Sequence, residues 1–431
     1  MKPTELRRLE GELHEFLFEM FDGLGRRERV ESMSWYVTGL LLDGERKSTE
    51  PMAARLTGHP DEVSGMRQRL QECVSISAWS EDDVLSRLAA KVEADLPGIE
   101  ALVIDDTGFP KKGKHSVGVQ RQYSGTLGRQ DNCQVATSLH VAGEQGSACI
   151  AFRLYMPESW CSDGERRRKA KVPDDVVFLR KWEIALRQID DALRWGVRRH
   201  VVLADAGYGE ITEFRDELEA RQLKYLVGIP GEPVVWAPGS APAIPPKKAR
   251  IGRPRTRYID TKHPPISVRD LSLTLPFRKV SWRQGSRGWQ SSRFAAVRIR
   301  TAHRHTIGAA PGPEQWLLCE WPASEAAPKK FWLSNLPPKA SITTLARLAK
   351  LRWRVERDYQ ELKQEIGLDH FEGRTWRGFH HHAALCAVAH AFLALRRALF
   401  PPEPSEVDDL PRSPRAPAST PFLDRHMPAL P

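Results

Sequence analysis

The first 95 residues carry apolar positions at the spacing of helices. The clearest series is Leu9, Leu13, Phe16, Leu17 and Met20. Side chains three or four positions apart share one helix face, so this series predicts an amphipathic helix. Ser48, followed by Thr-Glu-Pro, is typical of a helix start, and further helical stretches cover 66–73 and 82–92. We predict a small helical N-terminal domain over residues 1–95, either a DNA-binding bundle or a structural cap.

From about Ile99 the pattern changes to short apolar strands separated by helices. Strands are predicted at 101–104, 116–120, 134–141, 150–155, 200–204 and 224–229. Amphipathic helices are predicted at 176–195 and 211–222. Adjacent strands followed by β-α-β units are typical of a mixed α/β domain. Residues 96–231 are therefore predicted to form the first part of such a domain.

A β-rich segment then interrupts this domain. Residues 239–258 are rich in proline and basic side chains, as in a loop or linker. Strands without intervening helices are predicted at 272–280, 292–300 and 315–321. We therefore predict an insertion over 232–328, after which the α/β domain resumes over 329–398.

The resumed part begins with a predicted strand, 330–334. It continues into a long amphipathic stretch, 347–374, whose spacing predicts a single helix. After Phe400, nine of 31 residues are proline. The segment 399–431 is therefore predicted to be a Pro-rich disordered tail.

Positive charge is concentrated in the predicted insertion. The formal net charge of the chain is +10, and residues 241–310 hold 16 Lys and Arg against two Asp, a local net charge of +14. Such a segment is the electrostatic footprint of a polyanionic partner, and nucleic acid fits best. A membrane surface fits less well, because the segment predicts strands and loops and no amphipathic helix.

The cysteines and the apolar runs bear on the compartment. The six cysteines form no C-x-x-C pair, which is typical of a reducing compartment and unlike a disulfide framework or a zinc ribbon. The sequence shows no apolar run near the roughly 18 residues that span a bilayer. The charged N-terminus is not followed by an apolar core, unlike a signal peptide. We predict a cytoplasmic protein.

Acidic residues follow two of the predicted strands. Asp105 and Asp106 come directly after the strand 101–104, and Asp205 follows the strand 200–204. The carboxyl ends of strands in an α/β sheet lie where such sheets bind ligands. Each acid alone is equally consistent with a turn or a helix N-cap. Together they indicate a site.

Glu356 lies between two cations in the stretch 347–374. Arg352 precedes it by four residues and Lys363 follows it by seven. At about 100° per residue these spacings return to nearly one helix face, although a solvated helix with i,i+4 pairs has the same pattern. With the strand-end acids, Glu356 completes a set of three carboxylates. Such a set suits Mg²⁺ or Mn²⁺, and two ions about 4 Å apart could drive phosphodiester cleavage.

These motifs resemble those of the DDE-type transposases of bacterial insertion sequences. The resemblance is to the group with a Y-x2-R-x3-E-x6-K signature, which places Arg352, Glu356 and Lys363 on R, E and K. It covers about residues 100–395, and a large β-strand insertion between the second and third acids is also characteristic of the group. It implies an α/β fold class: an RNase H-like core, interrupted by the β-rich insertion and preceded by the helical N-terminal domain.

The resemblance also implies the catalytic set. Asp105, Asp205 and Glu356 would be the catalytic acids and would hold two Mg²⁺ or Mn²⁺ ions, with Asp106 as the alternative first acid. The implied chemistry is hydrolysis that frees a 3′-hydroxyl, followed by attack of that hydroxyl on target DNA. Such chemistry takes place at the ends of a mobile element.

Phosphate contacts follow from the same signature. Arg352 and Lys363 would bind phosphates beside the scissile bond. In the family, the tyrosine of the signature contacts a DNA phosphate near the cleavage point. Here its position is Ala349, and Tyr359 could take over its role.

Other cations and aromatics are further candidate DNA contacts. Arg253 and Arg255 resemble the core of a minor-groove hook, although a generic basic linker explains them as well. Trp332, on the strand that returns from the insertion, could stack on a flipped base or belong to the core. Just past the first acid lie three lysines that could contact DNA or solvate a loop: Lys111, Lys112 and Lys114.

A histidine-rich stretch near the C-terminus invites comparison with a zinc site. His382, Cys386 and His390 recur every four residues. The stretch is otherwise apolar, so we interpret all three as packing residues. His380 and His381 lie next to them and could face the acidic site. The sequence shows no Gly-rich nucleotide loop and no serine elbow, so no nucleotide cofactor is predicted.

The sequence as a whole predicts a DNA transposase of an insertion sequence. Its partners would be double-stranded DNA, as terminal inverted repeats and as target, and a second copy of the chain in a homodimer. Its location would be cytoplasmic and nucleoid-associated, without a membrane partner. Two alternatives stay open: a nuclease of the same fold that cuts without strand transfer, and a captured transposase that acts only as a DNA-binding protein.

Overall fold

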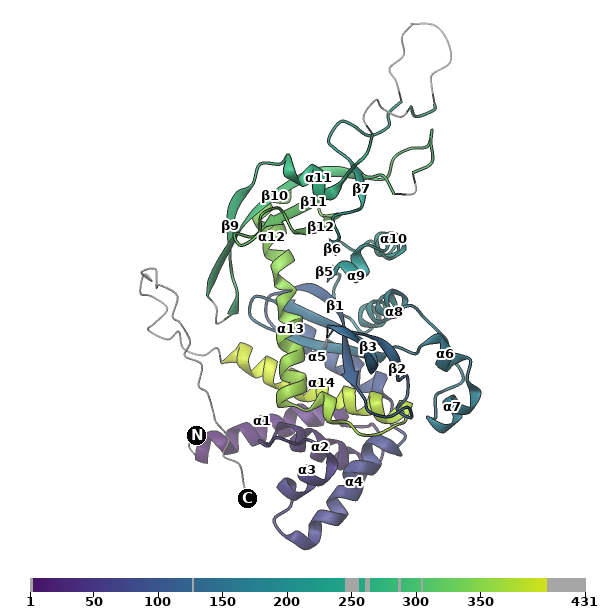
Figure 1. Cartoon of the computed structure of the whole chain (residues 1–431). Helices are drawn as coiled ribbons and strands as arrows, with labels where there is room; N and C mark the ends of the chain where they lie inside the picture. Colours follow the sequence, from purple (N-terminus) through teal and green to yellow (C-terminus); the bar gives the residue numbers. More distant parts are fainter. Residues whose placement is uncertain are drawn as a thin grey trace, which may run out of the picture. The chain divides into compact units, whose positions relative to one another are not determined.

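The N-terminal segment folds into helices, as its apolar spacing predicts (Figure 1). The computed structural model describes residues 3–125, 128–244, 256–259, 264–285, 288–303 and 305–400. The first helices are α1 (Pro3–Phe21), α2 (Arg27–Leu41), α3 (Thr49–Leu56), the 3-10 turn η1 (Pro60–Glu62), α4 (Val63–Ser75) and α5 (Glu81–Asp95). Ser48 occupies the N-cap position of α3, and Ser80 caps α5 by accepting a hydrogen bond from the Asp83 amide. The status of this segment as a separate domain stays a prediction.

A mixed sheet follows the helices. Its first strands are β1 (Ile99–Pro110), β2 (Gln120–Ser124), β3 (Arg129–Gly143), β4 (Ser147–Leu154), β5 (Val201–Ala204) and β6 (Tyr225–Ile229). Strand β3 pairs antiparallel with β1, β2 and β4, whereas β5 pairs parallel with β1 and β6. The helices between the strands are α6 (Glu158–Cys161), α7 (Gly164–Lys169), α8 (Lys181–Arg194), α9 (Ala206–Gly209) and α10 (Thr212–Ala220). The predicted α/β class is confirmed.

One predicted strand of this region is wrong. Residues 116–119 form a turn, and β2 begins only at Gln120. The reason is Gly118, whose φ of 69° lies in the left-handed region, while the Val119 amide bonds back to the Ser116 carbonyl. Alternation of apolar and polar residues did not reveal this turn.

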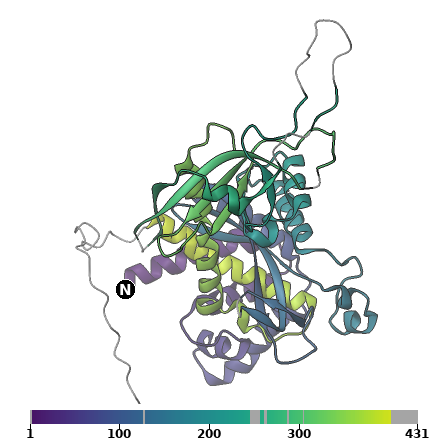
Figure 2. The same ribbon diagram turned by 45° about the horizontal axis from the view of Figure 1, so that its top comes forward.

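The strands of the predicted insertion extend the same sheet. They are β7 (Val234–Trp236), β8 (Ile266–Ser267), β9 (Arg278–Arg283), β10 (Trp289–Thr301) and β11 (Gln315–Trp321), and β12 (Lys330–Ser334) follows them. β12 pairs antiparallel with β6 on one side and with β11 on the other. The predicted strand 272–280 is wrong in its first half, because Ser267 caps a short helix there, α11 (Val268–Leu273). Figure 2 shows the inserted strands gathered near α12 (Ile342–Leu351), which packs against β9, β10 and β11.

The predicted single helix over 347–374 is also wrong. α12 ends at Leu351, α13 spans Trp353–Gln360, and a π-helical turn, η3, covers Glu361–Glu365. The helical run stops at Gly367, which has a left-handed φ of 87°. A Cβ added there would lie 2.5 Å from the Cβ of Lys47, so only glycine fits. The short turn η4 (Leu368–His370) follows.

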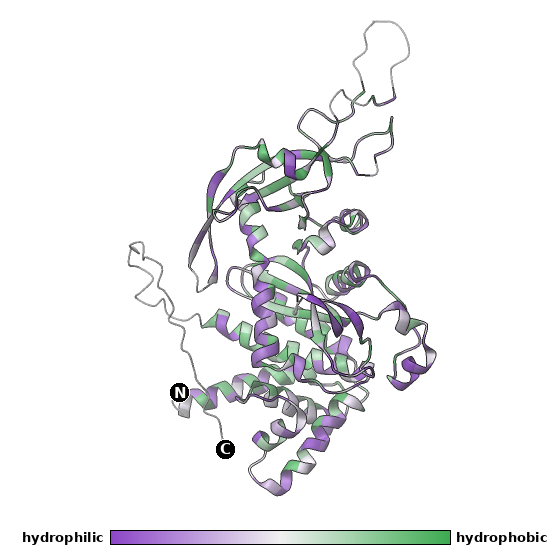
Figure 3. Cartoon of the chain, viewed as in Figure 1, coloured by the Kyte–Doolittle hydropathy of each residue, from purple (hydrophilic) through white to green (hydrophobic). Residues whose placement is uncertain are grey.

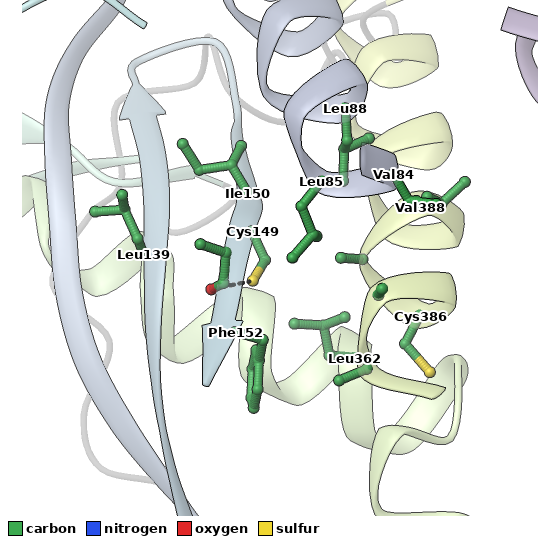
Figure 4. Close-up of a cluster of buried hydrophobic side chains, with 14 of the residues drawn as sticks. Val84, Leu85, Leu88, Leu139, Cys149, Ile150, Phe152, Leu362, Cys386 and Val388 are labelled. Carbon is green, nitrogen blue, oxygen red and sulfur yellow. Dashed lines mark hydrogen bonds between the residues drawn. The ribbon is translucent and has the colours of Figure 1, made fainter. Parts of the chain in front are cut away.

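The hydrophobic core lies between the sheet and the last helix, α14 (Trp376–Leu399). Strand β4, the N-terminal helices α2, α4 and α5, and α14 pack together. Figure 4 shows this packing for Leu85 of α5, Ile150 and Phe152 of β4, and Val388 of α14. By contrast, α13 is hydrophilic over most of its length (Figure 3).

One apolar helix is longer than the sequence pattern indicated. Trp376–Leu399 is long and apolar enough to cross a membrane by length and composition, and 72% of its most apolar window is buried. The prediction that no such run exists is therefore wrong. Its burial against β4 and the N-terminal helices accounts for its apolar composition.

Candidate active site

Asp105 and Asp205 lie level with each other on neighbouring parallel strands. The register of β1 and β5 pairs Leu102 with Val202 and Val103 with Leu203, and β5 ends just before Asp205. Asp105 is inside β1, not after it as predicted, because β3 continues to pair with β1 as far as Pro110. The predicted placement at a strand end holds for Asp205, and the parallel register brings Asp105 beside it.

Asp205 also serves as a helix cap. Its side chain accepts a hydrogen bond from the Tyr208 amide at 3.4 Å at the start of α9. The next turn lies tight against β6, since a Cβ added at Gly209 would lie 2.0 Å from the Gly228 carbonyl oxygen. The Ala-Gly-Tyr-Gly sequence thus lets the chain turn sharply beside the sheet and leaves the Asp205 carboxylate at its edge.

Glu356 is joined to the strand acids through Arg352. Arg352 lies between α12 and α13 and donates hydrogen bonds to Asp105 Oδ2 at 2.7 Å and to Glu356 Oε1 at 3.3 Å. The side chains of Asp105, Arg352 and Glu356 are 15%, 26% and 68% exposed, respectively. The structure therefore joins two of the predicted acids through one predicted cation, Arg352, and the charge of the third acid, Asp205, acts on both Asp105 and Arg352.

Partial burial and neighbouring charges change the pKa values of Asp105 and Arg352 in this cluster. Burial raises the pKa of Asp105 to about 6; the Arg352 guanidinium opposes that rise and the Asp205 carboxylate adds to it. For Arg352, burial favours the neutral form, but Asp105 and Asp205 outweigh it and raise the pKa. Carboxylates with a raised pKa beside a cavity are typical of functional sites.

The donor set suits a hard divalent cation in part. Asp105, Asp106 and Asp205 line a cavity of about 610 Å³, and carboxylate oxygens are the ligands that Mg²⁺ and Mn²⁺ prefer. Within the described ranges, however, no group of three ligating side chains is close enough to hold one ion. Two carboxylates are in place, and the third, Glu356, is held by Arg352 instead.

A family model described as "DDE superfamily endonuclease" matches residues 19–289. The chain belongs to the DDE superfamily of endonucleases. The match contains Asp105 and Asp205, and Glu356 lies beyond it. Nucleases of this superfamily generally use divalent metal ions, which agrees with the carboxylate chemistry of the site.

A curated relative points in the same direction. A probable transposase for insertion sequence element IS701 from Microchaete diplosiphon is 29% identical over 204 residues. The aligned region is 46% of this chain and 48% of that protein. The chain therefore spans about half the length of this relative.

The second candidate for the first acid, Asp106, has a different partner from Asp105. Asp106 is the next residue of β1 and lines the same cavity as Asp105. Asp106 Oδ2 accepts a hydrogen bond from Lys181 Nζ at 2.8 Å. Sequence reasoning missed Lys181; its only signal is a position near the start of a predicted helix. The cavity beside the acids is also lined by Tyr123, Arg180 and Trp182, which were not predicted.

Two further candidate DNA contacts, Lys363 and Tyr359, are partly buried near the first acid. Lys363 Nζ donates to the Gly108 carbonyl at 2.9 Å, three residues along β1 from Asp105, and burial lowers its pKa to about 8. The Tyr359 hydroxyl is hydrogen-bonded to Ser138 Oγ at 2.6 Å, and Ser138 pairs with Asp105 in the sheet register. Tyr359 therefore packs behind the first acid.

The remaining candidate DNA contacts lie on other parts of the chain. Trp332 is partly buried on β12 and packs against the core, consistent with the core alternative. Lys111 Nζ donates to the Phe371 carbonyl, whereas Lys112 is exposed, and both line a cavity of about 280 Å³. Lys114 is also exposed. Two predicted contacts, Arg253 and Arg255, lie outside the described residues. The predicted tail from residue 401 also lies outside them.

The histidines of α14 are packing residues, in line with the interpretation from the sequence. His381 stacks on Trp79, with ring centroids 3.7 Å apart, and His382 bonds to the Tyr36 hydroxyl at 2.9 Å. His380 bonds to the Leu154 amide and to the Trp376 carbonyl. The suggestion that His380 and His381 face the acids is wrong, because both rings are buried and bond to other groups: His380 to Leu154 and Trp376, and His381 to Trp79. Burial lowers the pKa of each, to about 3 and about 4 respectively.

Proposed function

We propose that this protein is the DNA transposase of an insertion sequence, with an RNase H-like catalytic core. The observation that carries the proposal is that Arg352 joins Asp105 to Glu356 while Asp105 and Asp205 line one cavity. Membership of the DDE superfamily supports DNA cleavage, and the likeness to a probable transposase supports action at the ends of a mobile element. The sheet order β4-β3-β1-β5-β6, antiparallel before β1 and parallel after it, supports the RNase H-like core.

The proposed site binds Mg²⁺ or Mn²⁺ through the carboxylates of Asp105, Asp205 and Glu356. Two such ions, when bound, activate a nucleophile and stabilise the leaving oxygen of a phosphodiester. Arg352 would bind the phosphate beside the scissile bond, since a guanidinium pairs with phosphate in a bidentate manner. Lys363, next to Gly108 on β1, would extend this contact along the strand.

A second DNA contact is proposed on the hairpin of β9 and β10. Its outward face consists of exposed cross-strand pairs: Lys279 with Arg293, Ser281 with Ser291, and Arg283 with Trp289. The opposite face, with Val280 and Trp282, is buried against the core beside α12. No acidic residue occurs between positions 278 and 301. A two-stranded basic ribbon has the width of the major groove of DNA.

The hairpin is close enough to the acids to act on the same DNA. A Cβ added at Gly285 would lie 2.8 Å from the Trp353 ring, and Trp353 is the residue after Arg352. A cavity of about 400 Å³ lies at this junction, lined among others by Arg283, Lys350 and Trp353. A duplex that presents a phosphate to Arg352 can therefore continue onto the ribbon.

Neutralising the ribbon should weaken DNA binding in a salt-dependent way. The double variant Lys279→Gln/Arg283→Gln should bind duplex DNA about tenfold more weakly and reduce the slope of log K against log salt by about two, one per phosphate contact. The measurement is fluorescence anisotropy over a salt series. The control is Arg221→Gln, whose guanidinium pairs with Asp190 and Glu217 on another part of the chain. An unchanged slope in the double variant would remove the ribbon from the DNA path.

Transposition chemistry requires two element ends in one complex. We therefore propose a homodimer on double-stranded DNA, with terminal inverted repeats and target DNA as substrates. The proposed location is the cytoplasm, in association with the nucleoid.

The test of the function uses the DNA that flanks the gene. Wild-type protein is incubated with supercoiled plasmid carrying both flanking ends, with Mn²⁺, with Mg²⁺ or with a chelator. Metal-dependent cutting at the element boundary, and joining of pre-cut ends to target DNA, are the expected results. Cutting without joining would indicate a nuclease of the same fold. Salt-sensitive binding without cutting would indicate a captured transposase that acts as a DNA-binding protein.

A further inference from the structure

Arg352 occupies the position where the acids of the proposed site converge. Its guanidinium bonds to Asp105 at 2.7 Å and to Glu356 at 3.3 Å, and the charge of Asp205 acts on it as well. Two of the three carboxylates that would bind a cation are thus already paired with a cation of the chain. Among the residues described, no group of three ligating side chains, these acids included, is arranged to hold an ion.

The geometry allows this contact to open. Arg352 lies at a junction, since it ends α12 and starts α13, and its side chain is 26% exposed at the edge of the cluster. The Glu356 side chain is 68% exposed, so its carboxylate can turn towards Asp105 without displacing packed residues. Strand β1 and the cap at Asp205 hold the other two acids in place.

Two ligands would act on Arg352 with the same result. A divalent cation competes with the guanidinium for the oxygens of Asp105 and Glu356. A DNA phosphate competes with these carboxylates for the guanidinium, to which it can bond in a bidentate manner. Binding of either ligand therefore weakens the contact that opposes the other. Such coupling is reciprocal, because it is a property of the equilibrium.

We infer that Arg352 is a latch that makes divalent-cation binding and DNA binding cooperative. Without DNA, Arg352 keeps the acids neutralised and the site poorly loaded. With a phosphate on Arg352, the carboxylates are released together and the site takes up its cations. This inference rests on the proposed function and adds a means by which the site is kept inactive away from DNA.

The experiment measures binding of Mn²⁺ to the full chain by electron paramagnetic resonance, with and without a short duplex oligonucleotide. In wild type, the duplex should tighten Mn²⁺ binding about tenfold, within the range usual for coupled sites. In Arg352→Gln, Mn²⁺ should bind about tenfold more tightly than in wild type without DNA, and the duplex should add little. Arg352→Lys, which keeps the charge, should bind Mn²⁺ without DNA as weakly as wild type.

Two controls make the result specific. Lys181→Gln removes a neighbouring cation that pairs with Asp106 at 2.8 Å, and it should leave the effect of the duplex intact. Asp105→Asn should abolish the Mn²⁺ signal that responds to the duplex. Thermal melting of each variant confirms that it is folded.

The latch and the proposed function fail in different ways. If Arg352→Gln binds Mn²⁺ no more tightly than wild type while the duplex still tightens binding, the latch is wrong, and wild-type cleavage leaves the function standing. An equal gain in Lys181→Gln also overturns the latch, because loss of any nearby charge would then suffice. If wild type neither binds Mn²⁺ with DNA nor cuts DNA, the proposed function itself fails, and the latch with it.

Discussion

Asparagine in place of Asp105 is expected to lower DNA cleavage at least about a thousandfold, the scale of a lost charge-stabilising ligand in a phosphoryl-transfer site. The Asp105 carboxylate lies level with Asp205 and bonds to Arg352, so no neighbour can replace it. Asp106→Asn is expected to lower cleavage less than about tenfold, because that carboxylate faces Lys181. The measurement is the rate of cutting of the plasmid with both flanking ends.

This pair of variants decides which aspartate is the first acid. Both change one carboxylate to an amide of the same shape, and both lie on β1, so effects on folding are matched. DNA affinity should stay at the wild-type value in Asp106→Asn and should not fall in Asp105→Asn, where Arg352 loses a competing carboxylate, which separates chemistry from binding. A dead Asp106→Asn with an active Asp105→Asn would reverse the assignment, and two active variants would contradict the proposed site.

Asp358→Ala is expected to lower the free energy of unfolding by about 3–5 kcal/mol, the usual cost of breaking a buried charge pair. Asp358 is 3% exposed and accepts hydrogen bonds from His140 Nδ1 at 2.7 Å and from Ser147 Oγ at 2.6 Å. Although burial disfavours the charge of His140, Cys149 and Asp358 outweigh it and raise the pKa of His140 to about 10. Removal of Asp358 would leave His140 without its acidic partner. Urea unfolding followed by circular dichroism gives the value.

The matched control for Asp358 is an exposed acid at the end of the same helical run. Glu365 is 51% exposed and reaches Arg357 and Arg397 only at 4.0 and 3.9 Å. Glu365→Ala should therefore change the free energy of unfolding by no more than about 0.5 kcal/mol. If Asp358→Ala were equally mild, the pair with His140 would contribute little, and α13 would be held by its apolar contacts.

The spacing of apolar residues, together with residues typical of turns and helix starts, was enough to predict most of the fold. The strand that ends before Asp205 and the strand Lys330–Ser334 are short apolar runs, and the predicted helix start at Ser48 lies at the N-cap position of α3. These features are local, so they can be recognised without knowledge of the partners. The three acids could be predicted for a related reason: two follow apolar runs, and the third has cations at helical spacing.

What the sequence missed depends on long-range contacts. The break at Arg352 is not visible in the helical period, and neither is the contact of Arg352 with Asp105, 247 positions away. In the helical pattern Asp358 cannot be distinguished from the solvated acids beside it, yet it is buried against β3 and β4. The sequence does not indicate the role of Lys181, because that role depends on its bond to Asp106 of β1. In each case the partner across the sheet decides the role.

The pairing of β12 with both β6 and β11 has a consequence for anyone who shortens this chain. Excision of residues 232–328 would remove β11 and leave β12, with Phe331 and Leu333, as the last strand of the sheet. Its unpaired amides and carbonyls would then be exposed, and a strand of another molecule could pair with them. The insertion thus also covers β12 and prevents it from becoming an exposed edge strand that could pair with other molecules.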